Sequence, residues 1–221
     1  MRTVKGEKIL VAMSGGVDSS VAAYLLQQAG YDVIGVTMRF WVDPFAEENA
    51  GAEAKGCCSH DAVTDAQKVA SILGFPHYTL NMREKFYDQV VCRFTEDYLK
   101  GRTPNPCIEC NRDIKFSHLL HKAQGLGINL IATGHYARIG YDWDNKRYRL
   151  YKGIDGWKDQ SYMLYVLKQE ELAATIFPLG DKNKEEVRKI ASAAHLPVYQ
   201  KEESQEICFI PDDDYRSFIE R

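Results

Sequence analysis

The sequence predicts an α/β protein built on a doubly wound parallel sheet, with a helical C-terminal part. Three observations lead to this prediction. Apolar runs alternate with helical patterns through residues 7–133, the order typical of strand–helix–strand units. The Val- and Ile-rich run at 31–38 does not alternate with polar residues, as expected for a parallel strand buried on both faces. Gly30 follows the helical pattern 18–29 and is a suitable left-handed stop.

The individual elements follow from local patterns. We expect strands at 7–13, 31–38, 76–80 and 129–133, and helices at 18–29, 59–73, 81–100, 111–124 and 183–195. Ser59 would cap the second helix, and residues 43–56 would form a mobile surface loop because they are acidic, aperiodic and rich in Ala and Gly. Residues 137–151 alternate and turn at Asp144-Asn145, which predicts a hairpin at the sheet edge. A last helix would begin after Pro211.

Composition limits the class of protein. The chain has 221 residues, 45% apolar and 27% charged, enough for the core of a soluble globular protein. Its longest purely apolar stretch, 9–13, is far too short to span a membrane, and its start does not resemble a signal peptide, so we expect a cytoplasmic protein. Six cysteines in such a chain indicate reduced thiols that serve chemistry or metal binding. A net charge of −3 gives no whole-chain argument for nucleic-acid binding.

The stretch VAMSGGVDSS, residues 11–20, joins the first strand to the first helix. Gly15 and Gly16 allow the backbone to approach a phosphate closely, and the positive end of the helix favours an anion. Its hydroxyl donors are Ser14, Ser19 and Ser20. The loop has no lysine to neutralise a γ-phosphate, so we assign that task to Mg²⁺, with Asp18 as its carboxylate partner. This arrangement suits the release of pyrophosphate better than the transfer of a γ-phosphoryl group.

The stretch GRTPNPCIECNRDIKF, residues 101–116, sets two thiols on a proline-constrained loop that leads into a helix. Thiolates at a helix N-terminus near cations have depressed pKa values and are better nucleophiles, and Arg112 and Lys115 would supply the cations. The alternatives are core packing or half of a zinc site completed by Cys57, Cys58 and His60. Cys208, far along the chain, is by itself more typical of a core residue.

Several other residues allow two interpretations. His135 would lie near a nucleotide or serve as a hydrogen-bonded structural histidine. Trp41, Trp143 and Trp157 would stack on bases, although partial burial is the commoner role. Residues 147–151 alternate basic and aromatic groups, as in an RNA-facing strand or an ordinary edge hairpin, and we expect residues 182–189 to form a solvated helix face.

The loop SGGVDSS resembles the PP-loop of the N-type ATP pyrophosphatases, which activate a carbonyl by adenylation. Seven motifs in one order over nearly the whole chain resemble the tRNA-specific 2-thiouridylases, which replace the 2-oxygen of the wobble uridine by sulfur. The motifs are SGGVDSS at 14–20, the methionine of VTM at 38, GCCS at 56–59, GRTPNPCIECN at 101–111, ATGHYAR at 132–138, KDQSYML at 158–164 and SQEICFI at 204–210. A nucleotide synthetase with a PP-loop would share 14–20 but would have no use for thiols at 110 and 208.

The resemblance implies ATP and Mg²⁺ and assigns residues to the site. The residues implied to bind ATP are Ala12, Met13, Ser14, Gly15, Gly16, Val17, Asp18, Ser19, Met38 and Gly134. Cys110 would be the nucleophile, and Cys208 would carry the persulfide sulfur. The residues implied to contact tRNA or its target base are Asn105, Pro106, Cys107, Lys158, Asp159 and Gln160.

Cys107 is a position where the family varies, because many members carry aspartate there, so a general-base role cannot be transferred. It would join the sulfur relay, or Cys107, Cys110 and Cys208 would ligate a [4Fe-4S] cluster with one open iron. We favour the relay because nothing in the sequence requires a metal. The implied partners are tRNA, bound through the anticodon stem-loop, and a sulfur donor, either a cysteine desulfurase or a relay protein.

The resemblance also predicts the domain organisation. Residues 1–200 would form the catalytic domain, and 201–221 would begin the segment that leads to a central domain. Residues 198–208 should be mobile, since Cys208 must approach Cys110. Relatives continue into a central domain and a C-terminal β-barrel. We therefore expect this chain to bind ATP but to bind tRNA more weakly than a longer relative, because RNA affinity depends on phosphate neutralisation.

Overall fold

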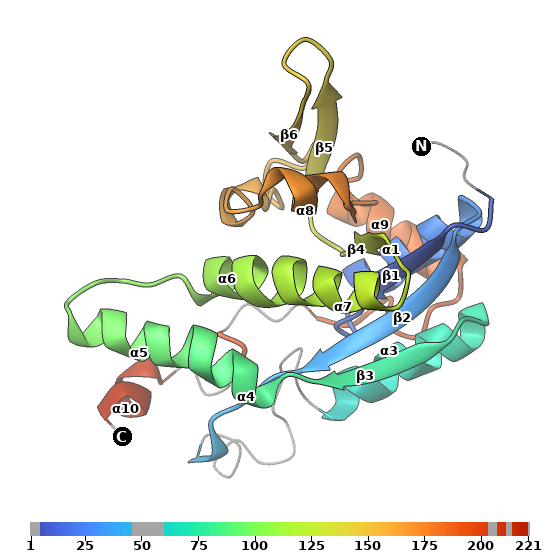
Figure 1. Ribbon diagram of the computed structural model, residues 1–221. Helices are drawn as coiled ribbons and strands as arrows, with labels where there is room; N and C mark the ends of the chain where they lie inside the picture. The colour runs from blue at the N-terminus through green and yellow to red at the C-terminus, as the bar shows by residue number, and fades with distance from the viewer. Residues whose placement is uncertain (1–4, 46–59, 203–206, 211–213, 221) are drawn as a thin grey trace.

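A five-stranded parallel sheet forms the centre of the molecule (Figure 1). The computed structural model describes residues 5–45, 60–202, 207–210 and 214–220. The strands are β1 (Lys8–Ala12), β2 (Asp32–Arg39), β3 (His77–Asn81), β4 (Leu130–Ala132) and β7 (Thr175–Ile176), in the order β3-β2-β1-β4-β7. The central strand β1 pairs with β2 on one side and β4 on the other. The strand order therefore reverses at the carboxyl end of β1, the place where open α/β sheets bind ligands. The predicted doubly wound sheet is confirmed.

Successive residues of β1 pack into two separate cores. Ile9 and Val11 lie in a core with residues of α1 (Val17–Gln28), α3 (His60–Leu73) and α9 (Lys184–Ala193). Leu10 lies in the other core, with the two long helical runs described below. Because strand side chains alternate between faces, this division places helices on both faces of the sheet.

Two long helical runs cover the second face, and each contains a stretch of π-helix. The first consists of α4 (Arg83–Phe86), the π-helical turn Tyr87–Val91 and α5 (Cys92–Leu99). The second consists of α6 (Pro106–Glu109), the π-helical segment Cys110–His118 and α7 (Leu119–Gly125). The sequence predicted helices here, but a hydrophobic period cannot reveal where the bonding changes to π. Such segments are frequent at functional sites, and the second begins at Cys110.

The predicted hairpin exists, but its placement at the sheet edge is wrong. β5 (Ala137–Asp142) and β6 (Arg147–Lys152) form a separate antiparallel sheet that projects from the body (Figure 1). The edge of the main sheet is β7, whose two residues are too short to give a periodic signal. α8 (Gln169–Ala173) lies beneath the hairpin (Figure 1).

The remaining elements follow the predictions closely. Asn183 caps α9 in a reciprocal capping box with Glu186. A helix after Pro211 is confirmed as α10 (Tyr215–Glu220). None of the helices in the described part of the chain is long and apolar enough to cross a membrane. The predictions for Ser59, Cys57 and Cys58, most of the 43–56 loop, and part of the 198–208 segment lie outside the described residues.

Candidate functional site

The SGGVDSS loop lies at the switch point and is fixed by its own hydroxyl groups. The backbone N–H of Ser14 donates to Ser19 Oγ over 3.1 Å, and the hydroxyls of Ser19 and Ser20 donate to the Gly16 carbonyl over 3.2 and 2.8 Å. Gly16 is the N-cap of α1, and no side chain of the described residues caps it. The start of α1 therefore lacks the side-chain acceptor that most helices have, and this leaves its first amides available to an anion.

Two glycines of the predicted site are required by close backbone contacts. Gly15 has a φ of +68°, and a Cβ there would lie 2.2 Å from the Ala62 carbonyl oxygen. A Cβ on Gly134 would lie 2.8 Å from the backbone nitrogen of Ser19. Both positions exclude any side chain, so the loop after β4 packs directly on the start of α1.

Asp18 is held by a lysine that the sequence analysis placed on a solvated helix face. Lys184 Nζ lies 2.7 and 2.8 Å from the two carboxylate oxygens of Asp18, and Tyr136 Oη donates to Oδ1 over 2.8 Å. The Lys184 side chain is only 14% exposed. The expectation of a solvated face is therefore wrong for Lys184, because its position at the start of α9 directs it at α1.

A second lysine contacts the same loop from near the C-terminus. Lys201 Nζ donates to the Gly15 carbonyl over 3.2 Å and to Asp65 Oδ2 over 2.7 Å. Arg188 supports this segment by donating to the carbonyls of Tyr199 and Lys201. Two cations from distant parts of the sequence therefore border a loop that contains none. The sequence gives no local signal for either, since Asp18 and Lys184 are 166 positions apart.

The C-x-x-C motif lies on the first turns of the second helical run. Asn105 caps α6 by accepting from the backbone N–H of Cys107 over 3.1 Å. Cys107 is exposed, whereas Cys110 is buried in the core of the second face. Cys208 is half-buried against that same core. The structure thus brings Cys110 and Cys208 into one hydrophobic cluster.

Arg112, one of the two cations expected beside these thiols, forms ion pairs with acidic side chains. Arg112 forms ion pairs with Glu109 and Asp113, and Arg93 bridges the same two carboxylates. Hydrogen bonding to Asp113 is the main reason that the pKa of Arg112 is raised. Two neighbouring acids therefore balance the charge of Arg112, and an effect of this cation on the thiols stays a prediction.

The segment expected to contact tRNA is tied to the backbone around it. Asp159 accepts from the backbone N–H groups of Gly153 and Ser161 and from the Ser161 hydroxyl. Burial raises the pKa of this carboxyl, but these hydrogen bonds outweigh burial and hold it below its ordinary value. Gln160 exchanges two hydrogen bonds with the backbone of Tyr136. Lys158 is half-buried beside them.

Two buried polar residues, His135 and Asn111, lie near the site. His135 is buried, lies 2.7 Å from Thr133 Oγ1 through Nδ1, and packs between Phe116 and Phe177. Burial, together with the charge of Lys115, lowers its pKa well below the ordinary value, which favours the structural interpretation of this histidine. Asn111, next to Cys110, donates to the Met163 carbonyl, while its Oδ1 has no partner among the described residues.

Other predicted residues contribute through the backbone or belong to the core. The side chains of Met13, Val17 and Met38 are buried. These residues would therefore contact a nucleotide through their main-chain atoms, or through the packing of its base against their buried side chains. Trp41 packs on Tyr87 and Phe218, as expected. Partial burial is wrong for Trp143 and Trp157, which are 76% and 98% exposed. In the described ranges, no three His, Cys, Asp or Glu side chains gather as a metal site.

The parallel sheet and the glycine loop at its switch point define an α/β domain of the PP-loop type. The chain belongs to the family described as the tRNA methyl transferase HUP domain, whose model matches residues 7–212. It is 61% identical over 97% of its length to tRNA-specific 2-thiouridylase MnmA 1 of Caldanaerobacter subterraneus subsp. tengcongensis. It is 55% identical over 99% of its length to tRNA-specific 2-thiouridylase MnmA of Carboxydothermus hydrogenoformans. The chain spans 58% and 60% of those two relatives.

Solved structures show the same fold at low sequence identity. NMN synthetase from Francisella tularensis matches with a TM-score of 0.54 and 20% identity, over 91% of this chain and 67% of that one. Glutamine-dependent NAD+ synthetase from Acinetobacter baumannii, solved with ADP, matches with a TM-score of 0.55 and 16% identity, over 92% and 34%. These similarities support the α/β fold.

Proposed function

We propose that this chain is the catalytic part of an ATP-dependent tRNA-uridine 2-sulfurtransferase. The observation that carries the proposal is the SGGVDSS loop at the β1–β4 switch point, in a chain 61% identical to a protein named tRNA-specific 2-thiouridylase. The proposed partners are tRNA, recognised at the wobble uridine, and a sulfur donor, either a cysteine desulfurase or a relay protein. A cytoplasmic location is part of the same proposal.

The loop residues suit a nucleoside triphosphate. Gly15 lets the loop pack against Ala62, and the start of α1 carries no capping side chain among the described residues, so its first amides are open to an anionic ligand. Lys184 and Lys201 supply the positive charge that the loop itself lacks. Ala12 to Ser19, with Met38 and Gly134, would surround the nucleotide.

Asp18 suits a divalent cation because its carboxylate oxygens are hard ligands beside the phosphate loop. Mg²⁺ bound there would neutralise the charge of the leaving pyrophosphate. In this structure Lys184 occupies both oxygens, so we propose that its ammonium moves toward the phosphates when the cation binds. Asp18 and Lys184 would then act together on the triphosphate.

The chemistry would take place in two stages, adenylation of the uridine and then sulfur transfer. The uridine 2-oxygen attacks the α-phosphorus of ATP, and the bond to pyrophosphate breaks. The terminal sulfur of a persulfide on Cys208 then attacks C2, and AMP leaves with the former 2-oxygen. Cys110 thiolate attacks the Cys208 sulfur, releases the new thiocarbonyl and closes a disulfide, which an external thiol reduces. Alternatively, Cys110 first attacks the inner sulfur of the Cys208 persulfide, which closes the disulfide and releases sulfide. The free sulfide then attacks C2.

The two thiols are associated with the same hydrophobic core. Cys110 lies in the core of the second face and Cys208 packs against that core, and Cys110 is shielded from water, which suits a resolving thiol. Asn105, Pro106 and Cys107 would adjoin the target base at the mouth of this site. Lys158, Asp159 and Gln160 would contact the tRNA backbone, in a loop that hydrogen bonds fix to Tyr136 and hence to Asp18.

Mass spectrometry of tRNA tests the proposal. After incubation with ATP, Mg²⁺ and a persulfide donor, the wobble uridine should gain the mass difference between sulfur and oxygen. Cys110→Ser and Cys208→Ser should abolish this gain, whereas Cys208→Ser should still adenylate the uridine. A Cys208→Ser variant that thiolates tRNA from a persulfide donor would contradict the relay.

An iron–sulfur mechanism is the second candidate, because Cys107 and Cys110 stand three positions apart on one helical run. Anaerobically purified protein should lack the broad visible absorption of a cluster if the relay operates. A spectrum with that absorption, lost in Cys107→Ser, would favour the cluster.

A further inference from the structure

Exposed aromatic side chains are concentrated in one part of the chain. Half of the large hydrophobic side chains that are exposed in the described residues lie between Tyr141 and Tyr165, and nearly all of these are aromatic. They are Tyr141, Trp143, Tyr151, Trp157, Tyr162 and Tyr165, together with Ile154. We call residues 138–165, which include the hairpin and the loop after it, the aromatic–basic segment. Aromatic rings of this size are usually buried, so their exposure indicates a binding surface.

Charge in this segment differs from that of the whole chain. Six basic residues stand against four acidic ones here, while the whole chain has 28 basic residues against 31 acidic. Most of these acidic side chains also accept hydrogen bonds from backbone N–H groups. Asp142 accepts from the N–H groups of Asp144 and Asn145, and Asp155 accepts from those of Trp157, Lys158 and Lys184. Asp142 also forms an ion pair with Arg149. The carboxylates keep their charge, so six basic against four acidic residues give the segment a net charge of +2, opposite in sign to that of the whole chain.

The hairpin has two different faces. Ile139, Tyr148 and Leu150 pack against the core, with the Tyr148 ring in edge contact with Tyr141. The opposite face carries Arg138, Arg147, Arg149 and Tyr151, because strand residues alternate. Gly140 lies under the Tyr151 ring, where a Cβ would come within 3.0 Å of it. Cations and a ring are thus displayed side by side on one strand.

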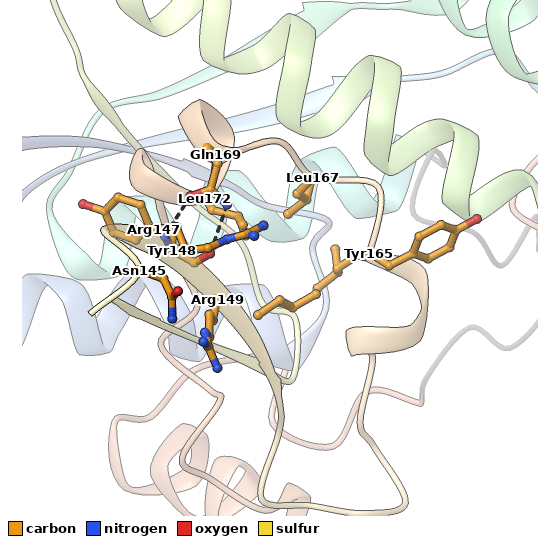
Figure 2. Close-up of a pocket in the computed structure, with 10 residues that line it drawn as sticks. Asn145, Arg147, Tyr148, Arg149, Tyr165, Leu167, Gln169 and Leu172 are labelled. Carbon is orange, nitrogen blue, oxygen red and sulfur yellow. Dashed lines mark hydrogen bonds between the residues drawn. The ribbon is translucent and has the colours of Figure 1, made fainter. Parts of the chain in front are cut away.

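A hollow of about 530 Å³ opens beside this strand, between β6 and the region of α8. Figure 2 shows Arg147 and Arg149 on its β6 side and Tyr165 and Leu167 on the opposite side. Gln169 hydrogen-bonds to both backbone groups of Tyr148, as the dashed lines mark, and so fixes the strand to α8 (Figure 2). The volume falls within the range of small-molecule sites, and it is large enough for an unstacked base.

Trp157 is presented on a rigid turn rather than on a loose loop. Asp155 Oδ1 accepts from the N–H groups of Trp157 and Lys158 over 3.0 and 3.2 Å, and its Oδ2 accepts from the N–H of Lys184 over 2.9 Å. The indole is 98% exposed on this fixed backbone. Lys184 also holds Asp18, so the turn is anchored to the residue that contacts the phosphate loop. An indole held in this way loses little entropy when a flat ligand stacks on it.

We propose that the aromatic–basic segment binds unpaired nucleotides of the RNA substrate, with a base stacked on Trp157 and phosphates bound by Arg147 and Arg149. This inference rests on the proposed function for the nature of the substrate, and adds residues that the family motifs do not contain. Rings with nearby cations match single-stranded RNA, whose bases stack and whose phosphates are anionic. Aromatic side chains and arginine are also frequent in protein interfaces. The observation that favours RNA is the net positive charge of the segment in a chain whose net charge is −3, and a protein partner is therefore one outcome of the test.

The test uses a fluorescein-labelled anticodon stem-loop with a wobble uridine and measures anisotropy at several salt concentrations. Trp157→Ala should weaken binding at least about fivefold, while Trp157→Phe should bind nearly as well as the wild type because it keeps a stacking ring. Arg147→Ala combined with Arg149→Ala should reduce the slope of log affinity against log salt by about 1.4. Tyr78→Ala, an exposed tyrosine on β3, is the matched control and should have no effect.

The outcomes separate this inference from the proposed function. RNA binding by the wild type with unchanged affinity in Trp157→Ala and in the double arginine variant overturns the inference alone. Loss of binding to a cysteine desulfurase in these variants, with RNA affinity unchanged, makes the segment a protein interface and also overturns it. A wild type that binds ATP but no RNA, even at low salt, contradicts both.

Discussion

At the scale of single residues, Asp18 is the point where the parts of the site meet. It lies in the first turn of α1, accepts from Tyr136 and forms an ion pair with Lys184 of α9. The carboxylate is 30% exposed and the lysine 14%, so the two charges form a partly buried ion pair. Removing one member should leave a poorly solvated charge, which is costly.

Lys184→Met should lower the free energy of unfolding by about 1–3 kcal/mol and weaken ATP binding, because Asp18 loses its counter-ion and the phosphates lose a cation. Asp18→Asn should abolish Mg²⁺-dependent ATP binding and adenylation while the protein still folds. Urea unfolding and ATP titration with and without Mg²⁺ measure both effects.

The matched control is Lys189→Met on the same helix, whose ion pair with Glu185 is exposed and should contribute under about 1 kcal/mol. The double variant Asp18→Asn with Lys184→Met should recover stability but not ATP binding. Full ATP affinity in Lys184→Met would show that the lysine serves only the fold.

His135 should make the fold sensitive to mild acid. Burial keeps its pKa well below the ordinary value of 6.5, so the unfolded chain binds a proton there that the native protein does not. Stability should therefore be complete above pH 6.5 and should fall as pH drops below it, by at most about 1.4 kcal/mol per pH unit from this group. His135→Asn should reduce the slope of unfolding free energy between pH 6.5 and 5.

His77 and His118 also have lowered pKa values because of burial, so the wild-type slope combines several groups. The difference between wild type and His135→Asn isolates one of them. His121→Gln, at an exposed position, is the control. An unchanged slope in His135→Asn would mean that this histidine titrates normally in the native protein.

At the scale of elements, the turn that begins at Asp155 connects the hairpin loop to α9. Its carboxylate accepts from the N–H of Lys184 at the start of the helix, which is the first cause of its lowered pKa, and from the Trp157 and Lys158 N–H groups. An acid at this end of a helix is also favoured by the helix dipole. The turn therefore sets both the start of α9 and the position of the Lys184 side chain.

Asp155→Asn should lower the free energy of unfolding at pH 7 by about 1–2 kcal/mol, since charge-assisted hydrogen bonds become neutral ones. Because the native pKa lies below the ordinary value of 3.8, this stabilisation is present above pH 3.8 and is lost as pH falls through the native pKa. In thermal unfolding, the midpoint temperatures of the wild type and Asp155→Asn should differ at pH 7. This difference should be smaller at pH 3.

Asp181→Asn is a suitable comparison for this variant. Asp181 is largely exposed, and its distance of 3.8 Å from Arg138 is too long for a hydrogen bond, so its ion pair should contribute little. A gap between wild type and Asp155→Asn that stays constant down to pH 3 would argue against a depressed pKa at Asp155.

Elements with strong local signals were predicted well from the sequence. Gly30 ends α1 with a φ of +92°, and the capping box at Asn183 begins α9. β7 and the π-helical segments were missed because two residues carry no period, and π bonding leaves the hydrophobic pattern nearly unchanged. The hairpin was misplaced because alternation predicts a strand but does not identify the strand it pairs with.

At the scale of the whole molecule, the central sheet brings distant segments to one point. The phosphate loop, the loop after β4, the start of α9 and the Lys201 segment all converge on the carboxyl end of β1. The SGGVDSS loop was predicted because a phosphate site is encoded in consecutive residues. Lys184, Tyr136 and Lys201 were not, because only the folded chain brings them to Asp18 and Gly15.

The central claim is that this site releases pyrophosphate while it activates a uridine. The direct test is product analysis with ATP labelled at the α-phosphate, in the presence of an anticodon stem-loop with a wobble uridine and no sulfur donor. A stem-loop with cytidine at the wobble position serves as the control. We predict AMP transfer to RNA and release of pyrophosphate, dependent on the wobble uridine and lost in Asp18→Asn. Formation of ADP and inorganic phosphate, or products that do not depend on the uridine, would contradict the claim.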